Sequence, residues 1–153
     1  MLTEEERRII EEEIREYDQK TAACISALKV VQRQRGWVPD EAIEDISELL
    51  GMTPDELDGV ATFYSLIFRK PLGKHVILVC DSISCWIMGY EKILDHIKTK
   101  LGIELGETSA DGKFTLLPIA CIGSCDNAPA MIIDNEVYRN LDIKKIDGIL
   151  GKY

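Results

Sequence analysis

The sequence is poor in basic residues and in long apolar runs, and each shortage excludes a class of function. Lysine and arginine total 18 against 27 aspartates and glutamates, a formal net charge of −9. Nucleic-acid binding depends on basic side chains that neutralise phosphates, so we expect no nucleic-acid partner. Runs such as Val76 to Cys80 are far too short to cross a bilayer. The acidic start, Met1 to Glu6, is not a signal peptide. We expect a protein without direct membrane insertion, in a reducing compartment.

Two further absences and the placement of the histidines narrow the chemistry. The chain has no G-x-G-x-x-G and no other phosphate-binding glycine loop, so we expect it to bind neither nucleotide nor flavin itself. It has no C-x-x-C opening a helix, the usual arrangement of a dithiol–disulfide enzyme. Its two histidines, His75 and His96, are expected on a strand and a helix. A Rieske centre, which needs two histidine ligands, is therefore disfavoured.

Apolar residues recur at helical spacing through the first part of the chain, which predicts a small helical bundle over residues 1–70. Thr3 and Glu6 form a capping-box pattern at the start of the first helix. The other helices are expected over about residues 21–35 with Gly36 as the stop, from Pro39-Asp40 to Gly51, and from Thr53 onward. Lone Cys24 falls on a helical face and is expected to be a buried apolar residue.

The pattern changes after a linker at Arg69 to Gly73, and residues 71–153 alternate between strand and helix signals. Elements are expected at His75 to Cys80 (strand), Met88 to Leu101 (helix), about Phe114 to Leu117 (strand), Ala130 to Ile133 and Glu136 to Tyr138 (a hairpin around Asp134-Asn135), and about Ile143 to Leu150 (helix). The order β-α-β-β-β-α predicts an α/β layer structure of thioredoxin-like type.

Four of the five cysteines form two close pairs. Cys80 and Cys85 have four residues between them, and Cys121 and Cys125 have three. Each pair is expected where a strand ends and a loop begins. This arrangement allows the two loops to contact the same bound group. Four thiolates are the ligand set of an iron–sulfur cluster or a closed zinc site. The sequence therefore predicts a metal centre.

The loops around the cysteines favour iron–sulfur over zinc. Zinc ribbons mostly use two-residue gaps, whereas wider loops suit a two-iron cluster with its own sulfides. Gly123 allows close backbone approach to an anionic cluster. Ser82 and Ser84 are expected to donate hydrogen bonds to sulfur, and three apolar residues are expected to keep water away: Ile83, Trp86 and Ile122. A zinc-stabilised interaction module and a dithiol enzyme remain open alternatives from spacing alone.

Several motifs resemble one known family. They are Gly36-Trp37, Val60 to Tyr64, Cys80 with Cys85, Asp111 to Thr115, and Cys121-Ile122-Gly123-Ser124-Cys125-Asp126-Asn127-Ala128-Pro129. Together they resemble the thioredoxin-like [2Fe–2S] subunits of NADH:quinone oxidoreductase, respiratory complex I, known in bacteria as the E subunits. The resemblance covers nearly the whole chain and implies an N-terminal helical domain (residues 1–70) followed by a thioredoxin-like [2Fe–2S] ferredoxin domain (residues 71–153).

The resemblance also implies a cofactor, a partner and a place. One [2Fe–2S] cluster is expected on Cys80, Cys85, Cys121 and Cys125. It would exchange a single electron with the FMN of a partner subunit that also binds NADH. Related subunits occur in NAD-linked hydrogenases and formate dehydrogenases, so an equivalent diaphorase subunit is the alternative. The expected location is cytoplasmic, peripheral on the inner face of the membrane. The apolar stretch Ser65 to Phe68 is expected either to dock on the partner or to tie the two halves together.

Overall fold

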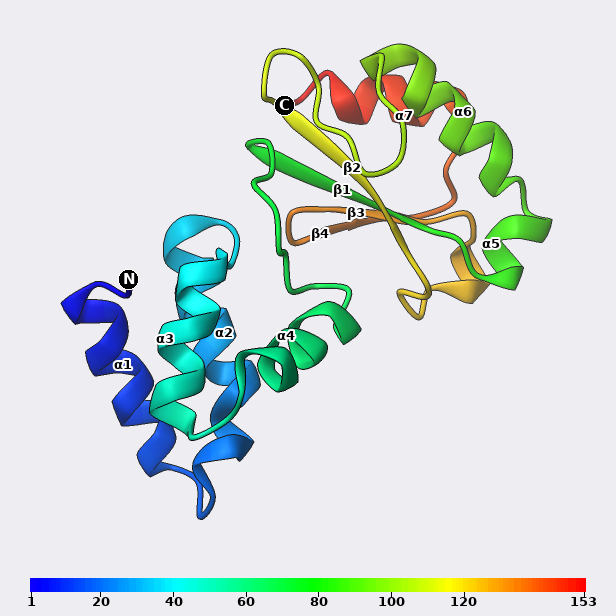
Figure 1. The fold of residues 1–153 in the computed structure, drawn as a ribbon. Coiled ribbons are helices and arrows are strands. Elements are labelled where there is room, and N and C mark those ends of the chain that lie inside the picture. The colour runs from blue at the N-terminus through cyan, green and yellow to red at the C-terminus, as the bar shows by residue number, and fades with distance from the viewer. The chain divides into compact units, whose positions relative to one another are not determined.

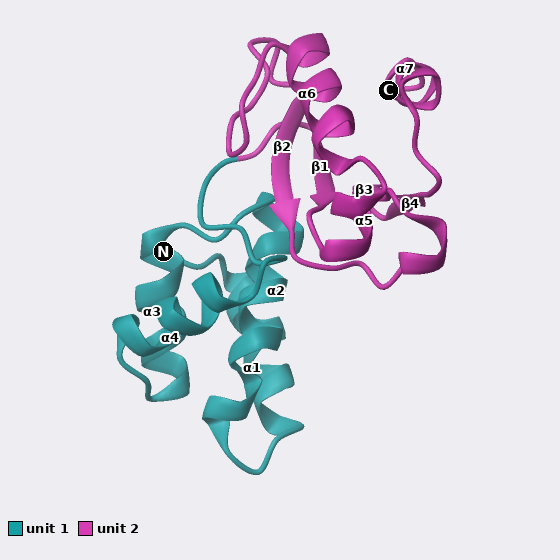
Figure 2. Ribbon diagram, turned by 90° about the vertical axis from the view of Figure 1, so that its right-hand side faces the viewer, with its two compact units in different colours: residues 1–71 teal, residues 72–153 magenta.

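The computed structural model describes residues 1–153, and the chain divides into two compact units. The first unit runs from Met1 to Pro71 and the second from Leu72 to Tyr153, coloured teal and magenta in Figure 2. None of the helices in either unit has both the length and the apolar character that crossing a membrane requires.

The first unit is a bundle of helices, as its periodicity predicts (Figure 1). Its elements are α1 (Glu4–Arg15), the 3₁₀ helix η1 (Lys20–Ala23), α2 (Cys24–Arg35), α3 (Asp40–Leu50) and α4 (Pro54–Phe63). Thr3 and Thr53 each form a capping box at the start of α1 and α4. Gly36 and Gly51 end α2 and α3 in the left-handed conformation that glycine adopts without strain. The predicted caps and stops are confirmed.

The bundle core is apolar except for the buried Ser47 and one buried ion pair. Ile10, Leu28 and Leu57 are fully buried in it, and Cys24 packs against it half-buried. The Glu6 side chain is 1% exposed and accepts hydrogen bonds from Arg35 Nε at 2.7 Å and Nη2 at 2.5 Å. Burial opposes ionisation of Glu6, but the hydrogen bonds from Arg35 and from the Thr3 backbone outweigh it and lower its pKa. The pair thus joins α1 to α2 inside the bundle.

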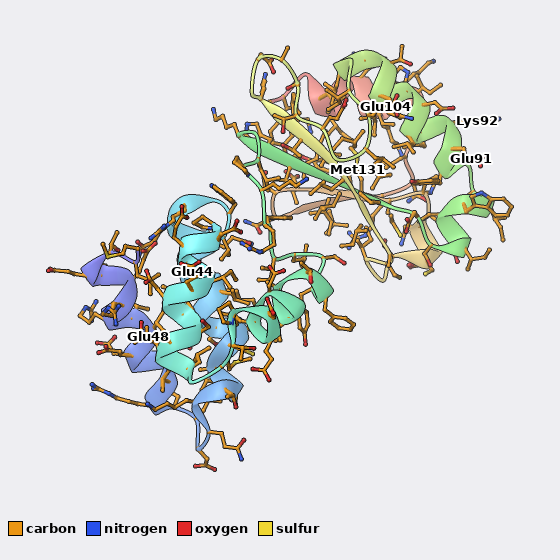
Figure 3. The ribbon with its side chains drawn as sticks, viewed as in Figure 1. Glu44, Glu48, Glu91, Lys92, Glu104 and Met131 are labelled. Atoms are coloured by element: carbon orange, nitrogen blue, oxygen red, sulfur yellow. The ribbon has the colours of Figure 1, made fainter.

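The second unit is built on a four-stranded sheet with the order β2-β1-β3-β4. The strands are β1 (His75–Cys80), β2 (Phe114–Ile119), β3 (Met131–Ile133) and β4 (Glu136–Tyr138). β1 pairs in parallel with β2 and antiparallel with β3, and β3 and β4 form the predicted hairpin. The side chain of Met131, labelled in Figure 3, is fully buried on the central strand β3. The predicted α/β fold is confirmed.

Side chains alternate between the two faces of β1. Ile77 and Val79 belong to a core that also contains Ile97 of α6 (Tyr90–Leu101) and Ile146 of α7 (Ile143–Leu150). Leu78 and Cys80 belong to a separate cluster on the opposite face. Figure 1 shows α6 and α7 together over one side of the sheet. The sheet therefore turns Cys80 away from its covering helices.

The helix predicted from Met88 is wrong at its start. It begins at Tyr90, and a separate short helix, α5 (Ile83–Ile87), precedes it. Gly89, with φ of +103°, stands between them because the left-handed conformation cannot continue an α-helix. Strand β2 is also two residues longer than predicted and ends at Ile119. The last helix has the predicted bounds.

The start of β1 is held against β2 by close backbone contact. Gly73 donates its N–H to Thr115 Oγ1 at 2.6 Å, and His75 N–H donates to the Lys113 carbonyl at 2.8 Å. A Cβ placed on Gly73 would lie 2.9 Å from the Gly112 carbonyl oxygen and 3.1 Å from the backbone of Lys113. Only glycine fits here without displacing backbone. This contact fixes the parallel register in which Cys80 faces Ile119.

Candidate metal centre

Both cysteine pairs begin at the same edge of the sheet. Cys80 is the last residue of β1 and lies opposite Ile119, the last residue of the parallel strand β2. The Asp81 N–H donates to the Ile119 carbonyl at 3.1 Å, so the two chains stay paired as they leave the sheet. Cys121 follows two residues later. The carboxyl ends of parallel strands are where such sheets bind ligands.

Cys80 and Cys85 are buried together beneath this edge. They are 3% and 2% exposed and share an apolar cluster with Leu78, Ile119 and Ala128. Cys85 lies on α5, not in a loop as its spacing predicts, because the chain coils into this short helix directly after Ser82.

The environment of Cys85 is unsuited to a free nucleophilic thiolate. Burial and a hydrogen bond with the Cys80 thiol together raise the pKa of Cys85 to about 11, against the opposite effect of a backbone hydrogen bond from Ala130. A dithiol–disulfide enzyme needs an exposed thiol of lowered pKa. The Cys85 thiol is buried and its pKa is raised, which argues against the dithiol alternative.

Cys121 and Cys125 are exposed on the loop that follows β2. Gly123 donates its backbone N–H to Cys121 Sγ at 3.3 Å and has a φ of +74°, a conformation that disfavours other residues. Cys125 opens the short 3₁₀ helix η2 (Cys125–Asn127). Its charge also raises the pKa of Cys85, so the two cysteines are within electrostatic reach.

The four thiols lie in two different environments. Two are buried side by side and two are exposed, and no group of three or more His, Cys, Asp or Glu side chains is arranged to hold one metal ion. Four thiols near one edge, with backbone N–H groups directed at two of the sulfurs, are a donor set of the kind that an anionic iron–sulfur cluster uses.

The loop that carries Cys121 and Cys125 is fastened by the segment that follows β4. Asn140 donates its backbone N–H to the Asn127 carbonyl at 2.7 Å and its side-chain amide to Asn127 Oδ1 at 3.0 Å. Arg139 Nε donates to Ser124 Oγ at 3.0 Å. No local sequence pattern indicates these contacts, because they join residues 13 and 15 positions apart across a hairpin. Sequence reasoning therefore missed them.

The outer face of α5 is exposed and apolar. Its large side chains are 53–69% exposed: Ile83, Trp86, Ile87 and the following Met88. The prediction that Ile83 and Trp86 shield the site is therefore wrong, whereas Ile122 does pack half-buried on the Cys80 cluster. Trp86 Nε1 donates to Glu91 of α6 at 3.3 Å; Glu91 and Lys92 are labelled in Figure 3. The proposed hydrogen bonds from Ser82 and Ser84 to sulfur stay predictions.

A groove of about 580 Å³ borders the α5 face. It is lined by Ile87, Met88 and Ile93 on one side and by Leu141 and Ile143 on the other. Lys92, Asp142 and Lys144 also line it, so the groove has an apolar floor with charged residues around it. The exposed apolar residues of α5 beside it are typical of a site where another protein binds. Ile87 of this groove and the buried Cys85 lie on the same short helix.

The sheet order, the helices on one face and the thiols at the strand ends define a thioredoxin-like α/β protein with a cysteine-lined edge. Residues 10–153 match the family described as "Thioredoxin-like [2Fe-2S] ferredoxin". The chain belongs to this family, and the resemblance noted from its motifs is confirmed. Membership implies a [2Fe–2S] cluster and a role in electron transport.

Relatives match the chain from end to end. It is 50% identical over 153 residues to the E subunit of NADH-quinone oxidoreductase from Pseudomonas aeruginosa, covering 100% of this chain and 92% of the relative. It is 49% identical over 152 residues to the protein of the same name from Escherichia coli K12, covering 99% and 92%.

A solved structure extends the likeness to a second kind of complex. The crystal structure of an NAD⁺-reducing [NiFe]-hydrogenase in the air-oxidised state superposes with a TM-score of 0.71 at 25% identity. The match covers 85% of this chain and 22% of the hydrogenase chain. The matching region is therefore one part of the longer hydrogenase chain.

Proposed function

We propose that this chain is the electron-transfer subunit of an NADH:quinone oxidoreductase and that Cys80, Cys85, Cys121 and Cys125 hold its one [2Fe–2S] cluster. The observation that carries the proposal is the parallel pairing of β1 and β2, which brings both cysteine pairs to one sheet edge. Family membership and the relatives named as E subunits of NADH-quinone oxidoreductase support it.

The surrounding residues have clear tasks at such a centre. When bound, the cluster supplies a site that takes up or releases one electron at a time. Burial of Cys80 and Cys85 keeps water from two of the ligand sulfurs. The Gly123 N–H donates to Cys121 Sγ, and the backbone hydrogen bond from Ala130 favours the ionised form of Cys85. Such bonds offset negative charge on thiolates.

Single serine substitutions of the four cysteines test the ligand set. Each should lose or strongly alter the visible absorption and the iron content of the anaerobically purified chain. The fifth cysteine provides the matched control, since Cys24 lies in the other unit and packs on the helical core. Cys24→Ser should retain full iron and sulfide. A variant of one of the four that keeps an unaltered cluster would remove that cysteine from the set.

The partner follows from the chemistry. NADH releases two electrons as a hydride, whereas the cluster takes one, so a flavin must stand between them. This chain carries no phosphate-binding glycine loop. We therefore propose that FMN and NADH bind to a partner subunit that docks on the apolar face of α5. Position supports this face, because Cys85 lies on the same helix and electron transfer requires close approach.

Reduction by NADH tests the partnership. The cluster of the isolated chain should not be reduced by NADH, and it should be reduced once the FMN-bearing subunit of the same organism is added. Reduction without that subunit would place a flavin or nucleotide site on this chain. Absence of reduction in a verified complex would refute electron exchange with FMN.

The alternative assembly is an NAD-linked hydrogenase or formate dehydrogenase, favoured by the likeness to the NAD⁺-reducing hydrogenase. The two assemblies are distinguished by assaying which electron donors and acceptors the purified complex uses. Quinone reduction by NADH supports the oxidoreductase, with the chain on the cytoplasmic side of the membrane as a peripheral subunit. NAD⁺ reduction by hydrogen or formate supports the alternative.

A further inference from the structure

Arg139 is a cation held beside the second cysteine pair. Its Nε donates to Ser124 Oγ at 3.0 Å, and Ser124 directly precedes Cys125. Ser124 is 7% exposed, one of only five buried polar residues in the chain. Arg139 takes part in none of the ion pairs of the structure. Its positive charge therefore lies beside a neutral hydroxyl, on the residue that directly precedes Cys125.

The backbone beside Arg139 is held by neighbouring hydrogen bonds. Asn140, the next residue, makes two hydrogen bonds to Asn127, at 2.7 and 3.0 Å. Asn127 in turn donates its N–H to the Ser124 carbonyl at 3.1 Å. The segment after β4 is thus attached to the cysteine loop at both Ser124 and Asn127. An arginine on a free surface loop has no such restraint, so a constant electrostatic effect is expected here.

We infer that Arg139, anchored by Ser124, is a positioning residue that raises the reduction potential of the cluster. The inference rests on the proposed ligand set. A cluster held by four thiolates is anionic and gains one more negative charge on reduction. A fixed cation nearby stabilises the reduced form more than the oxidised form, so it shifts the one-electron couple toward reduction.

Charge removal with two comparison variants tests this role. Arg139→Gln removes the cation, Arg139→Lys keeps it, and Lys113→Gln removes a cation at the opposite end of β2, where the strand starts. The midpoint potential of the full chain is measured by redox titration followed by EPR, at low and high salt. The readout is independent of catalytic turnover.

Arg139→Gln should lower the reduced-to-oxidised ratio at a fixed potential by about three- to tenfold, where tenfold corresponds to 59 mV for one electron. Arg139→Lys and Lys113→Gln should stay close to the native potential. The shift should shrink at high salt, because Arg139 is exposed to solvent and its charge is screened.

Each other outcome has a defined meaning. Equal potentials in Arg139→Gln and Lys113→Gln overturn the role of Arg139, as does a potential in Arg139→Lys as low as in Arg139→Gln. If Arg139→Gln does not retain a cluster, Ser124→Ala takes its place: freeing the anchor should also lower the potential, and a native potential there overturns the inference. A native chain without iron and sulfide refutes the proposed function instead.

Discussion

Substitution of Gly73 by alanine should destabilise the second unit, because the new methyl group has no space. The added Cβ would lie 2.9 Å from the Gly112 carbonyl oxygen and 3.1 Å from the backbone carbons of Lys113 and Phe114. All three neighbours are backbone atoms in or beside β2, so the strand itself must move. Overpacking of this kind costs about 1–3 kcal/mol.

A smaller effect opposes that cost. Alanine restricts the unfolded chain, which stabilises the folded state by about 0.4–1 kcal/mol where the native backbone tolerates it. The net loss in free energy of unfolding should therefore be about 1–2 kcal/mol. In a unit of this size each kcal/mol lowers the melting temperature by about 4–8 °C.

Gly148 provides the matched control in the same unit. It lies in α7, and a Cβ there meets nothing within 4 Å. Alanine is favoured over glycine in a helix by about 0.8–1.0 kcal/mol, so Gly148→Ala should raise the melting temperature.

The assay is thermal unfolding of the full chain, combined with hydrogen exchange of the β1 amides to assign the change to the second unit. Gly73→Ala should melt lower and exchange faster than the native chain, and Gly148→Ala should do the opposite. If Gly73→Ala proves as stable as the native chain, the close approach of β1 and β2 that sets the register of Cys80 is wrong.

Three further predictions follow from the site, the bundle and the α5 face. Gly123→Ala should cost roughly 1–2 kcal/mol because its φ is +74°, measured by urea unfolding, and the cluster should be lost faster on storage. The lowered pKa of Glu6 means that its pair with Arg35 stabilises the bundle fully above about pH 5 and less as the pH falls through that pKa. Glu6→Gln should therefore lose about 1–3 kcal/mol at pH 7 and show a flatter stability profile as the pH falls below the ordinary glutamate range. Ile87→Glu should weaken binding to the flavin-bearing subunit at least tenfold by calorimetry, because a charge enters an apolar contact.

Controls separate these effects from general unfolding. Lys152→Glu changes charge on the exposed surface near the C-terminal end of α7 and should leave partner binding unchanged. Ile87→Glu should keep its iron content, since the Ile87 side chain is 69% exposed. Equal affinity in Ile87→Glu and the native chain would exclude the α5 face as the docking surface.

Elements with strong local signals were predictable from the sequence. The strand His75–Cys80, the last helix and the hairpin around Asp134 rest on β-branched runs, helical spacing and a turn dipeptide, and all three form as predicted. The capping boxes at Thr3 and Thr53 are equally local. Short-range physical chemistry decides these elements.

The errors arise where tertiary context decides. Helix α5 is too short to be stable alone and forms where Cys85 is buried against the sheet edge, so no periodic pattern predicts it. Exposure of Trp86 could not be predicted either, because it depends on what covers α5. The bond from Arg139 to Ser124 spans a hairpin and leaves no spacing signature. The sequence identifies the cysteines, but only the fold reveals what surrounds them.

The central claim is tested most directly by metal analysis and EPR of the anaerobically purified chain. The account predicts two irons and two acid-labile sulfides per chain, no signal when oxidised, and one rhombic S = 1/2 signal per chain after reduction with dithionite. Stoichiometric zinc without iron, in protein from iron-replete cells, would make the four cysteines ligands of a structural zinc ion and contradict the electron-transfer account.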